Sequence, residues 1–218
     1  PLVTIRGFLE TLRDRDDQLA PEVRSHVIQV AHRNAVLLGE RIETLLRYEQ
    51  LAEDPTIAAH PQRVREVVSR IAEDCSGILA DHHLRQDVPG ELSADIDGEA
   101  MTHVLANLLG NAARHSPRES SITVRARPDG ETVRVEVVDA GSGISPEDLP
   151  HVFEPWYRGE APARGGSGLG LALVRRYVQA WGGTVAIEST PGRGTTVGFT
   201  LPRTPAPVTM LLPEPSVR

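Results

Sequence analysis

One amphipathic helix is predicted by the stretch Asn107-Leu108-Leu109-Gly110-Asn111-Ala112-Ala113-Arg114-His115-Ser116. Residues four apart share a helix face, so Asn107 and Asn111 project from the same side. Arg114 and His115 follow them, and this side therefore offers amide oxygens and then cationic donors. That order suits a metal-bound polyphosphate, since amide oxygens can bind a hard cation and cationic side chains can bind phosphate oxygens. The stretch taken alone fits a plain solvent-facing polar side equally well. Apolar residues can bury the opposite side: Met101, Val104, Leu105, Leu108, Leu109 and Ala112.

Length and composition narrow the class of protein. The 218 residues, 39% of them hydrophobic, are enough for one or two small domains with a real core. A net charge of −7 gives no basic surface for nucleic acid, so no nucleic-acid partner is expected. The single cysteine, Cys75, excludes an intramolecular disulfide and fits a reducing compartment. Cys75 is predicted to be a small core residue because it lies on an apolar stripe at helical spacing: Val64, Val67, Val68, Ile71, Ile78 and Leu79. No apolar run reaches membrane-spanning length.

Two amphipathic helices are expected at the start of the chain. The first carries an apolar stripe over residues 2–19, which Asp16-Asp17 interrupts, and Pro21 suits the first turn of a second helix over about 22–52. This hairpin cannot bury both stripes alone. A second copy would complete a dimeric four-helix bundle, and the alternative is packing against the rest of the same chain. The start inside an apolar pattern, without an initiator Met, predicts that the chain is part of a longer protein.

The chain is expected to divide at Asp54-Pro55, which ends the second helix. The domains are then a helical hairpin over 1–54, a second domain over 55–203, and a Pro-rich tail over 204–218 that is expected to be disordered.

The second domain reads as an α+β sandwich with helices on one face of a mixed sheet. An extended stretch near Ile57 comes first, and Asp97 is placed to cap the central helix. Turns are predicted at Pro128-Asp129-Gly130 and at Pro191–Gly194. The two other helices are expected over 62–82 and 168–181. Strands are expected over 84–88, 91–96, 121–127, 132–139, 184–189 and 195–201.

Two glycine-rich segments accompany the central helix. The first, Val138-Asp139-Ala140-Gly141-Ser142-Gly143-Ile144, ends a strand with a carboxylate that can accept from an exocyclic amine, and its glycines let the backbone approach a flat ring. The second, Gly165-Gly166-Ser167-Gly168-Leu169-Gly170-Leu171, opens a helix whose first N–H groups can bind an anion. No parallel strand–helix–strand unit surrounds it and the P-loop lysine is missing, so neither the dinucleotide fingerprint nor a P-loop fits.

Together these segments resemble the N, G1, F and G2 boxes of bacterial sensor histidine kinases. The matching residues are Asn107–Ala112, Asp139–Gly143, Phe153-Glu154-Pro155-Trp156-Tyr157-Arg158 and Gly166–Gly170. The likeness extends from Pro1 to Pro202, and Pro1–Phe8 resembles the stretch just after the phosphoacceptor histidine of the dimerisation helix. It implies a dimerising hairpin followed by an ATP-binding domain of the type shared with gyrase and heat-shock chaperones. The acceptor histidine would lie before Pro1, because none of the eight histidines stands in that place.

The resemblance also implies a role for each matching residue. Asn111 would ligate Mg²⁺, Arg114 and His115 would contact phosphate, and Asp139 would accept from adenine. Thr195 matches a water-linked adenine contact, and Arg158 matches an arginine that reaches the γ-phosphate from a flexible lid between Ser145 and Gly165. The expected catalytic residues are Asn107, Arg114 and Arg158. The expected nucleotide contacts are Asn107, Asn111, Arg114, His115, Asp139, Gly141, Gly143, Gly166, Ser167, Gly168, Leu169, Gly170 and Thr195.

The implied activity is transfer of the γ-phosphate of MgATP to a histidine and then to an aspartate of a response-regulator protein. Transfer of this kind depends mainly on positioning and charge neutralisation. The protein would be a homodimer in the cytoplasm, and any membrane segment would lie upstream.

Departures from the family pattern leave alternatives open. Trp156 replaces a phenylalanine, and His103 replaces a frequent glutamine. ATPases and serine kinases of the same fold usually carry a glutamate base where this chain has Asn107, and an amide cannot serve as a general base. A scaffold that binds ATP and dimerises without catalysis is the other alternative. Histidines outside the central helix are expected to be solvated: His26, His32, His60, His82, His83 and His151.

Overall fold

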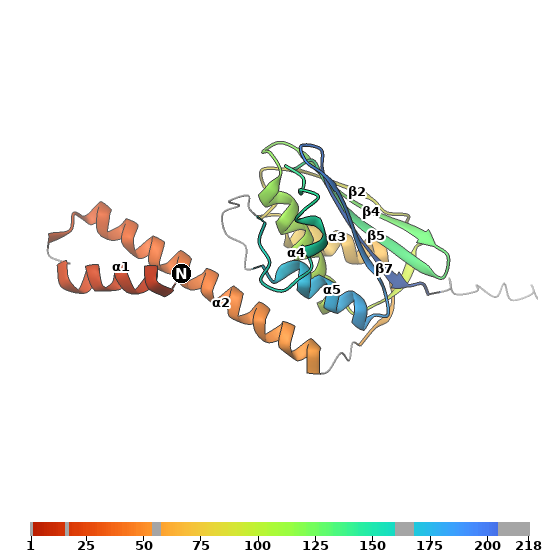
Figure 1. Cartoon of the computed structure of the whole chain (residues 1–218), viewed down its shortest axis with the longest axis horizontal. Coiled ribbons are helices and arrows are strands. Elements are labelled where there is room, and N and C mark those ends of the chain that lie inside the picture. The colour runs from red at the N-terminus through yellow and green to blue at the C-terminus, as the bar shows by residue number, and fades with distance from the viewer. Residues whose placement is uncertain (1, 16–17, 54–57, 160–167, 205–218) are drawn as a thin grey trace, which may run out of the picture. The chain divides into compact units, whose positions relative to one another are not determined.

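The computed structural model describes residues 2–15, 18–53, 58–159 and 168–204. Its contacts divide the chain into two units, Pro1–Gln50 and Leu51–Arg218. The first unit is a helical hairpin of α1 (Leu2–Arg15) and most of α2 (Pro21–Glu53), red to orange in Figure 1. The predicted second helix is confirmed, with Pro21 as its first residue, where a missing N–H breaks no helical hydrogen bond. The expected interruption at Asp16-Asp17 and the expected boundary at Asp54-Pro55 lie outside the described residues.

The hairpin buries little of its apolar surface. Val27 and Ala31 are its buried residues among those described, and His26 and His32 are exposed as predicted. Apolar side chains remain exposed along both helices: Leu2, Val3, Leu9, Val23, Ile28, Val36, Ile42 and Leu46. The dimeric bundle that the apolar stripes predict stays a prediction.

The second unit is built on a five-stranded sheet in the order β2-β4-β5-β7-β6. The strands are β2 (His83–Asp87), β4 (Ser121–Asp129), β5 (Thr132–Asp139), β6 (Val185–Thr190) and β7 (Gly194–Pro202). The pairing of β2 with β4 is parallel and the other pairs are antiparallel, so the predicted mixed sheet is confirmed. A separate antiparallel pair joins β1 (His60–Arg63) to β3 (Ser93–Ile96).

Three helices cover one face of this sheet: α3 (Val64–Asp74), α4 (Gly98–His115) and α5 (Gly170–Ala180) (Figure 1). The helix-facing positions of β4 and β5 alternate as predicted, and they are buried: Ile122, Val124, Ala126, Val133, Val135 and Val137. The apolar side of α4 completes the core, with Met101, Val104 and Leu105 fully buried. Asp97 caps α4 as predicted, because its Oδ1 accepts from the N–H groups of Glu99 and Ala100, each at 3.0 Å.

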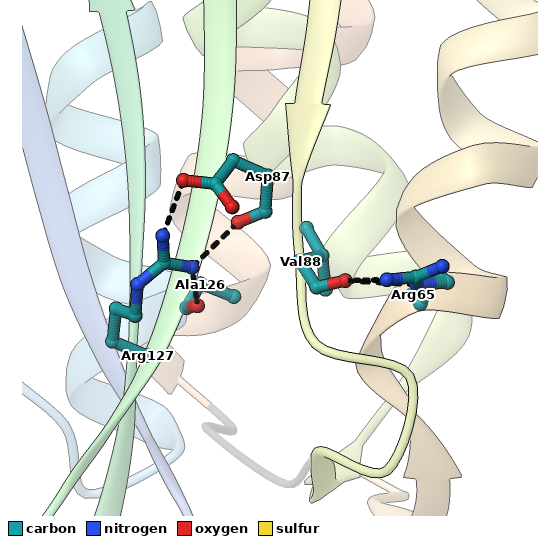
Figure 2. Close-up of polar contacts among 5 residues, drawn as sticks. All are labelled: Arg65, Asp87, Val88, Ala126 and Arg127. Carbon is teal, nitrogen blue, oxygen red and sulfur yellow. Dashed lines mark hydrogen bonds and ion pairs between the residues drawn. The ribbon is translucent and has the colours of Figure 1, made fainter.

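Two arginines fix the edge strand β2 (Figure 2). Arg127 on β4 donates from Nη1 to the Asp87 carbonyl at 2.9 Å and pairs through Nη2 with the Asp87 carboxylate. Arg65 on α3 donates from Nε to the Val88 carbonyl at 2.8 Å. Because β2 has β4 as its one neighbour among the described strands, these bonds secure the end of an edge strand.

Several predicted boundaries were wrong. The helix expected over 62–82 is α3, which ends at Asp74, and turns follow because Ser76 and Gly77 are weak helix formers. Cys75 is buried as predicted, whereas Ile78 on the expected stripe is 54% exposed. The Pro128-Asp129-Gly130 turn is tighter than expected, since β4 runs to Asp129.

At the end of the chain, Thr204 is the one residue of the predicted tail that the structure describes. Thr204 donates to the Asp95 carboxylate at 2.8 Å, and residues 205–218 lie outside the described part. The extended stretch expected near Ile57 also lies outside it, and the first described strand begins at His60.

Candidate functional site

The polar side of α4 meets the start of α5 at Asn107. Its Nδ2 donates to the His103 carbonyl one turn earlier, at 2.8 Å. Its Oδ1 faces Gly170, where an added Cβ would lie 2.7 Å away. Gly170 therefore lets α5 begin directly against the Asn107 amide. The assignment of both residues to the nucleotide site stays a prediction.

The next turn of α4 brings together an amide and two cationic groups. Arg114 donates from Nη1 to Asn111 Oδ1 at 2.8 Å. Burial of part of its side chain lowers the pKa of Arg114. The carbonyl of His115 accepts from the Ser142 N–H at 3.2 Å, and a Cβ on Gly141 would lie 2.7 Å from the same oxygen. The end of α4 is thereby packed against the glycines that follow β5.

Asp139 ends β5 with one carboxylate oxygen engaged. Its Oδ1 accepts from the N–H of Gly141 at 2.7 Å and from that of Thr195 at 3.2 Å. Within the described part of the chain, Oδ2 has no hydrogen-bond partner and can accept from a ligand. Burial raises the pKa of Asp139, and the two N–H groups and His115 oppose this shift. A half-buried carboxylate with one oxygen fixed and one available is suited to recognising an amine.

Two glycines of this region are crowded by backbone from other strands. Gly143 has φ +70°, and a Cβ there would lie 2.1 Å from the Thr190 carbonyl oxygen. Gly194 has φ +92°, and a Cβ there would lie 2.1 Å from the Asp139 carbonyl oxygen. Both positions combine left-handed backbone with a close approach, so glycine is required for two reasons.

The second glycine-rich segment is described from Gly168 onward. Gly168 has φ +76°, and its carbonyl accepts from the Trp156 N–H at 2.9 Å. Leu169 is fully buried and precedes α5 without capping its N-terminus through a side chain. Within the described residues, no side chain at the N-cap position occupies the first N–H groups of α5, which is the arrangement that an anion site at a helix start uses. Gly165, Gly166 and Ser167, which the sequence predicted as contacts, lie outside the described residues.

The part of the predicted lid that is described has a defined structure. Residues 145–159 contain the short 3₁₀ helix η2 (Leu149–His151) and a set of internal hydrogen bonds. Tyr157 donates to the Asp148 carboxylate at 2.6 Å, and His151 Nδ1 lies 2.9 Å from a Glu154 carboxylate oxygen. Arg158 follows Tyr157 and is exposed. The expected flexibility of the lid stays a prediction.

Ser189 on β6 is a positioning residue that the sequence did not single out. Its Oγ accepts from the Ile144 N–H at 2.9 Å and donates to the Gly194 carbonyl at 3.0 Å. It also lies 2.9 Å from Thr195 Oγ1. Ser189 thus joins the segment after Asp139 to the one containing Thr195. A serine in an alternating strand carries no local signal of such a role.

His115 gives the site a pH-dependent stability. Burial and the neighbouring Arg114 charge lower its pKa, and Asp139 opposes this shift. The folded chain therefore holds this proton less tightly than the unfolded chain, whose pKa is 6.5. The free energy of unfolding should then fall as the pH drops through 6.5 toward the folded pKa.

His115→Gln removes that titration. Urea unfolding between about pH 7.5 and about pH 5.5 should show a smaller decline in stability for the variant than for the wild type. Equal declines in the two proteins would contradict the direction of the shift.

Two features are absent from the described residues. No helix there is both long and apolar enough to cross a membrane. No cluster of three or more histidine, cysteine or acidic side chains there could hold a metal ion. A divalent cation at Asn111 would therefore need most of its negative charge from a ligand.

The chain is similar to known proteins in sequence and in fold. Residues 96–205 match the family described as histidine kinase-, DNA gyrase B- and HSP90-like ATPase. The chain is 34% identical to the histidine protein kinase DivJ of Caulobacter vibrioides, over 99% of this chain and 37% of DivJ. It is 40% identical to the sensor-like histidine kinase SenX3 of Mycobacterium tuberculosis, over 64% of this chain and 34% of SenX3. The chain thus spans little more than a third of these relatives.

A solved structure extends the likeness to the fold of nearly the whole chain. The Acinetobacter baumannii histidine kinase AdeS superposes with a TM-score of 0.77, covering 94% of this chain and 96% of that one, at 18% identity. At this identity the match supports the fold alone.

Proposed function

The chain belongs to the family of histidine kinase-, DNA gyrase B- and HSP90-like ATPases, and from this membership we propose that it is the catalytic part of a two-component protein-histidine kinase. It binds MgATP and transfers the γ-phosphate to a histidine of a dimerisation helix. An aspartate of a response-regulator partner then takes the phosphoryl group from that histidine. The relatives named as histidine kinases support the reaction type.

The Asp139 carboxylate is the observation that carries this proposal. Oδ1 is held by Gly141 and Thr195, which leaves Oδ2 to accept from the exocyclic amine of adenine. The crowded backbone at Gly143 and Gly194 keeps this oxygen in place. A purine ring needs such a fixed acceptor if adenine is to be distinguished from guanine.

The phosphate groups are assigned to the polar side of α4 and the start of α5. Arg114 and His115 contact phosphate oxygens, and the uncapped N–H groups of α5 add donors. Asn111 Oδ1, which Arg114 holds in this structure, is the proposed ligand for Mg²⁺. When bound, Mg²⁺ would neutralise part of the phosphate charge. Arg158 is proposed to approach the γ-phosphate.

The position of Asn107 argues against the alternatives with a general base. Its Nδ2 donates to the His103 carbonyl of the same helix, and its Oδ1 packs against Gly170 at the start of α5. An amide cannot remove a proton from water or from a serine hydroxyl. Hydrolysis and serine phosphorylation are therefore disfavoured, whereas a histidine acceptor needs less activation of its nucleophile. A scaffold without catalysis remains the alternative that the test below must exclude.

The acceptor histidine is proposed to lie outside the printed sequence. Pro1–Phe8 resembles the segment after that histidine, and His26 and His32 are exposed residues of α2. The exposed apolar residues of α1 and α2 support a homodimer through the hairpin. We place the chain in the cytoplasm, where ATP and a response regulator are available.

The test mixes the chain with a second protein that carries the same hairpin extended by the acceptor histidine. The second protein also carries Asn111→Ala and so should not use ATP itself. With γ-labelled MgATP, acid-labile label should appear on the second protein. It should disappear when the first chain also carries Asn111→Ala.

Other results would contradict the proposal in distinct ways. Acid-stable label would indicate a serine kinase, and free phosphate without labelled protein would indicate an ATPase. Nucleotide binding with neither product would indicate the scaffold. Label on a histidine of the printed chain would show that the acceptor has been misplaced.

A further inference from the structure

Asp148 lies beside the chain on both sides of Arg158. Its Oδ1 accepts from the Tyr157 hydroxyl at 2.6 Å, the short distance typical of a charge-assisted hydrogen bond. Its Oδ2 would lie 2.7 Å from a Cβ added at Gly159. One carboxylate therefore contacts the residue before Arg158 and packs against the residue after it.

Hydrogen bonds to Ser145 connect Asp148 to the segment that follows the proposed adenine site. Its N–H donates to Ser145 Oγ at 3.1 Å, and the Leu149 N–H donates to the Ser145 carbonyl at 3.0 Å. Ser145 follows Ile144, whose N–H donates to Ser189 Oγ at 2.9 Å. Since Ser189 also contacts Thr195, a continuous chain of bonds runs from the proposed adenine site to Asp148.

A second attachment holds the same segment at Trp156. Its N–H donates to the Gly168 carbonyl at 2.9 Å, just before α5 begins. Trp156 has φ +68°, a conformation that costs about 1–2 kcal/mol for a residue with a Cβ. The Gly168 side has no room for a Cβ, which would lie 2.8 Å from the Trp156 carbonyl carbon. The segment that carries Arg158 is thus held at the Trp156 backbone and at the Tyr157 hydroxyl, and the Asp148 carboxylate packs against Gly159.

We propose that the Asp148 carboxylate and the Tyr157 hydroxyl position Arg158 for the terminal phosphate of the nucleotide. The inference rests on the proposed function, which assigns Arg158 to the γ-phosphate. Asp148 and Tyr157 touch no reacting atom and act through Arg158. Their contribution should appear only with a ligand that has a third phosphate, because ADP offers Arg158 no γ-phosphate.

Titration calorimetry with Mg²⁺ tests this, using ADP and a non-hydrolysable ATP analogue. The wild type should bind the analogue more tightly than ADP, and Arg158→Ala should remove the difference. Tyr157→Phe should lower the affinity for the analogue by about threefold to tenfold, as expected for one lost hydrogen bond. Its affinity for ADP should stay within about twofold of the wild-type value. Asp148→Asn keeps an acceptor but loses the charge, and should act in the same direction.

Two further variants separate positioning from general damage. Tyr157→Phe added to Arg158→Ala should leave the ratio of the two affinities unchanged, because nothing remains to be positioned. Tyr48→Phe removes a hydroxyl from α2 in the other unit and should change neither affinity. If Tyr157→Phe lowers the affinities for ADP and for the analogue equally, the hydroxyl has a merely structural role.

The outcomes test this inference separately from the proposed function on which it rests. A wild type that binds neither nucleotide would contradict the proposed function. If Arg158→Ala changes the ratio of analogue affinity to ADP affinity but Tyr157→Phe keeps the wild-type ratio, the inference is overturned and the proposed function stands. If Arg158→Ala leaves the ratio of analogue affinity to ADP affinity unchanged, Arg158 does not contact the γ-phosphate, and the inference is contradicted as well.

Discussion

Asp139→Asn should lower the affinity for ADP by about tenfold to a hundredfold, which corresponds to about 1–3 kcal/mol for a buried polar group without its partner. The asparagine oxygen can still accept from Gly141 and Thr195, so the local backbone should keep its position. The second position then carries an NH₂ group, which faces the adenine amine as donor against donor. Calorimetric titration with ADP gives the loss directly.

The same substitution should change which base is preferred. Guanine presents O6 where adenine presents its amine, and an asparagine NH₂ can donate to that oxygen. The ratio of ADP to GDP affinity should therefore fall sharply in Asp139→Asn. Asp129→Asn, at the exposed end of β4, is the matched control and should leave both affinities unchanged. Equal binding of ADP and GDP by the wild type would contradict the assignment of Asp139 to the adenine amine.

Gly143→Ala should cost about 3 kcal/mol or more of stability and abolish measurable nucleotide binding. Left-handed backbone costs a residue with a Cβ about 1–2 kcal/mol. The new methyl would in addition lie 2.1 Å from the Thr190 carbonyl oxygen, so β6 and the Gly143 segment must separate. This movement would break the Ile144 hydrogen bond to Ser189 and shift the segment that follows Asp139.

Gly192→Ala is the matched control for Gly143→Ala. Its φ of +76° is close to that of Gly143, but nothing lies within 4 Å of the added Cβ. It should therefore show the conformational cost alone, about 1–2 kcal/mol, with nucleotide affinity retained. Urea unfolding and ADP titration of both variants measure the difference. Equal losses of stability and of ADP affinity in the two variants would show that the close approach to Thr190 does not control the geometry of the site.

The central helix shows how much of the structure the local sequence pattern predicts. Apolar residues at helical spacing predicted the buried side of α4, and Asp97 predicted its first residue. Alternation predicted β4 and β5, and the paired register confirms both strands. The family resemblance then indicated which residues should belong to one nucleotide site. The fold brings Asn107 to Gly170, His115 to Gly141, and Asp139 to Thr195.

Other features had no reliable local signal. The apolar stripe after Val64 continued beyond Asp74, yet the helix ended there. His82 was expected to be solvated, but both of its ring nitrogens are buried and lack a hydrogen-bond partner among the described residues. Ser189 and Asp148 resemble ordinary polar residues in the sequence. Their importance comes from partners elsewhere, such as Ile144, 45 residues before Ser189.

The sequence by itself determined the type and order of most elements and the polar residues that they carry. Helix periodicity, a capping carboxylate and strand alternation depend on neighbours within a few residues, so they can be read locally. Tertiary structure alone decided which glycines have no space for a side chain, which oxygen of Asp139 is available, and which residues contact the neighbours of Arg158. These depend on strand register and on contacts between distant segments, as with Asp139 and Thr195, 56 residues apart. Local preferences cannot specify them, because the same residues in another register would face other partners.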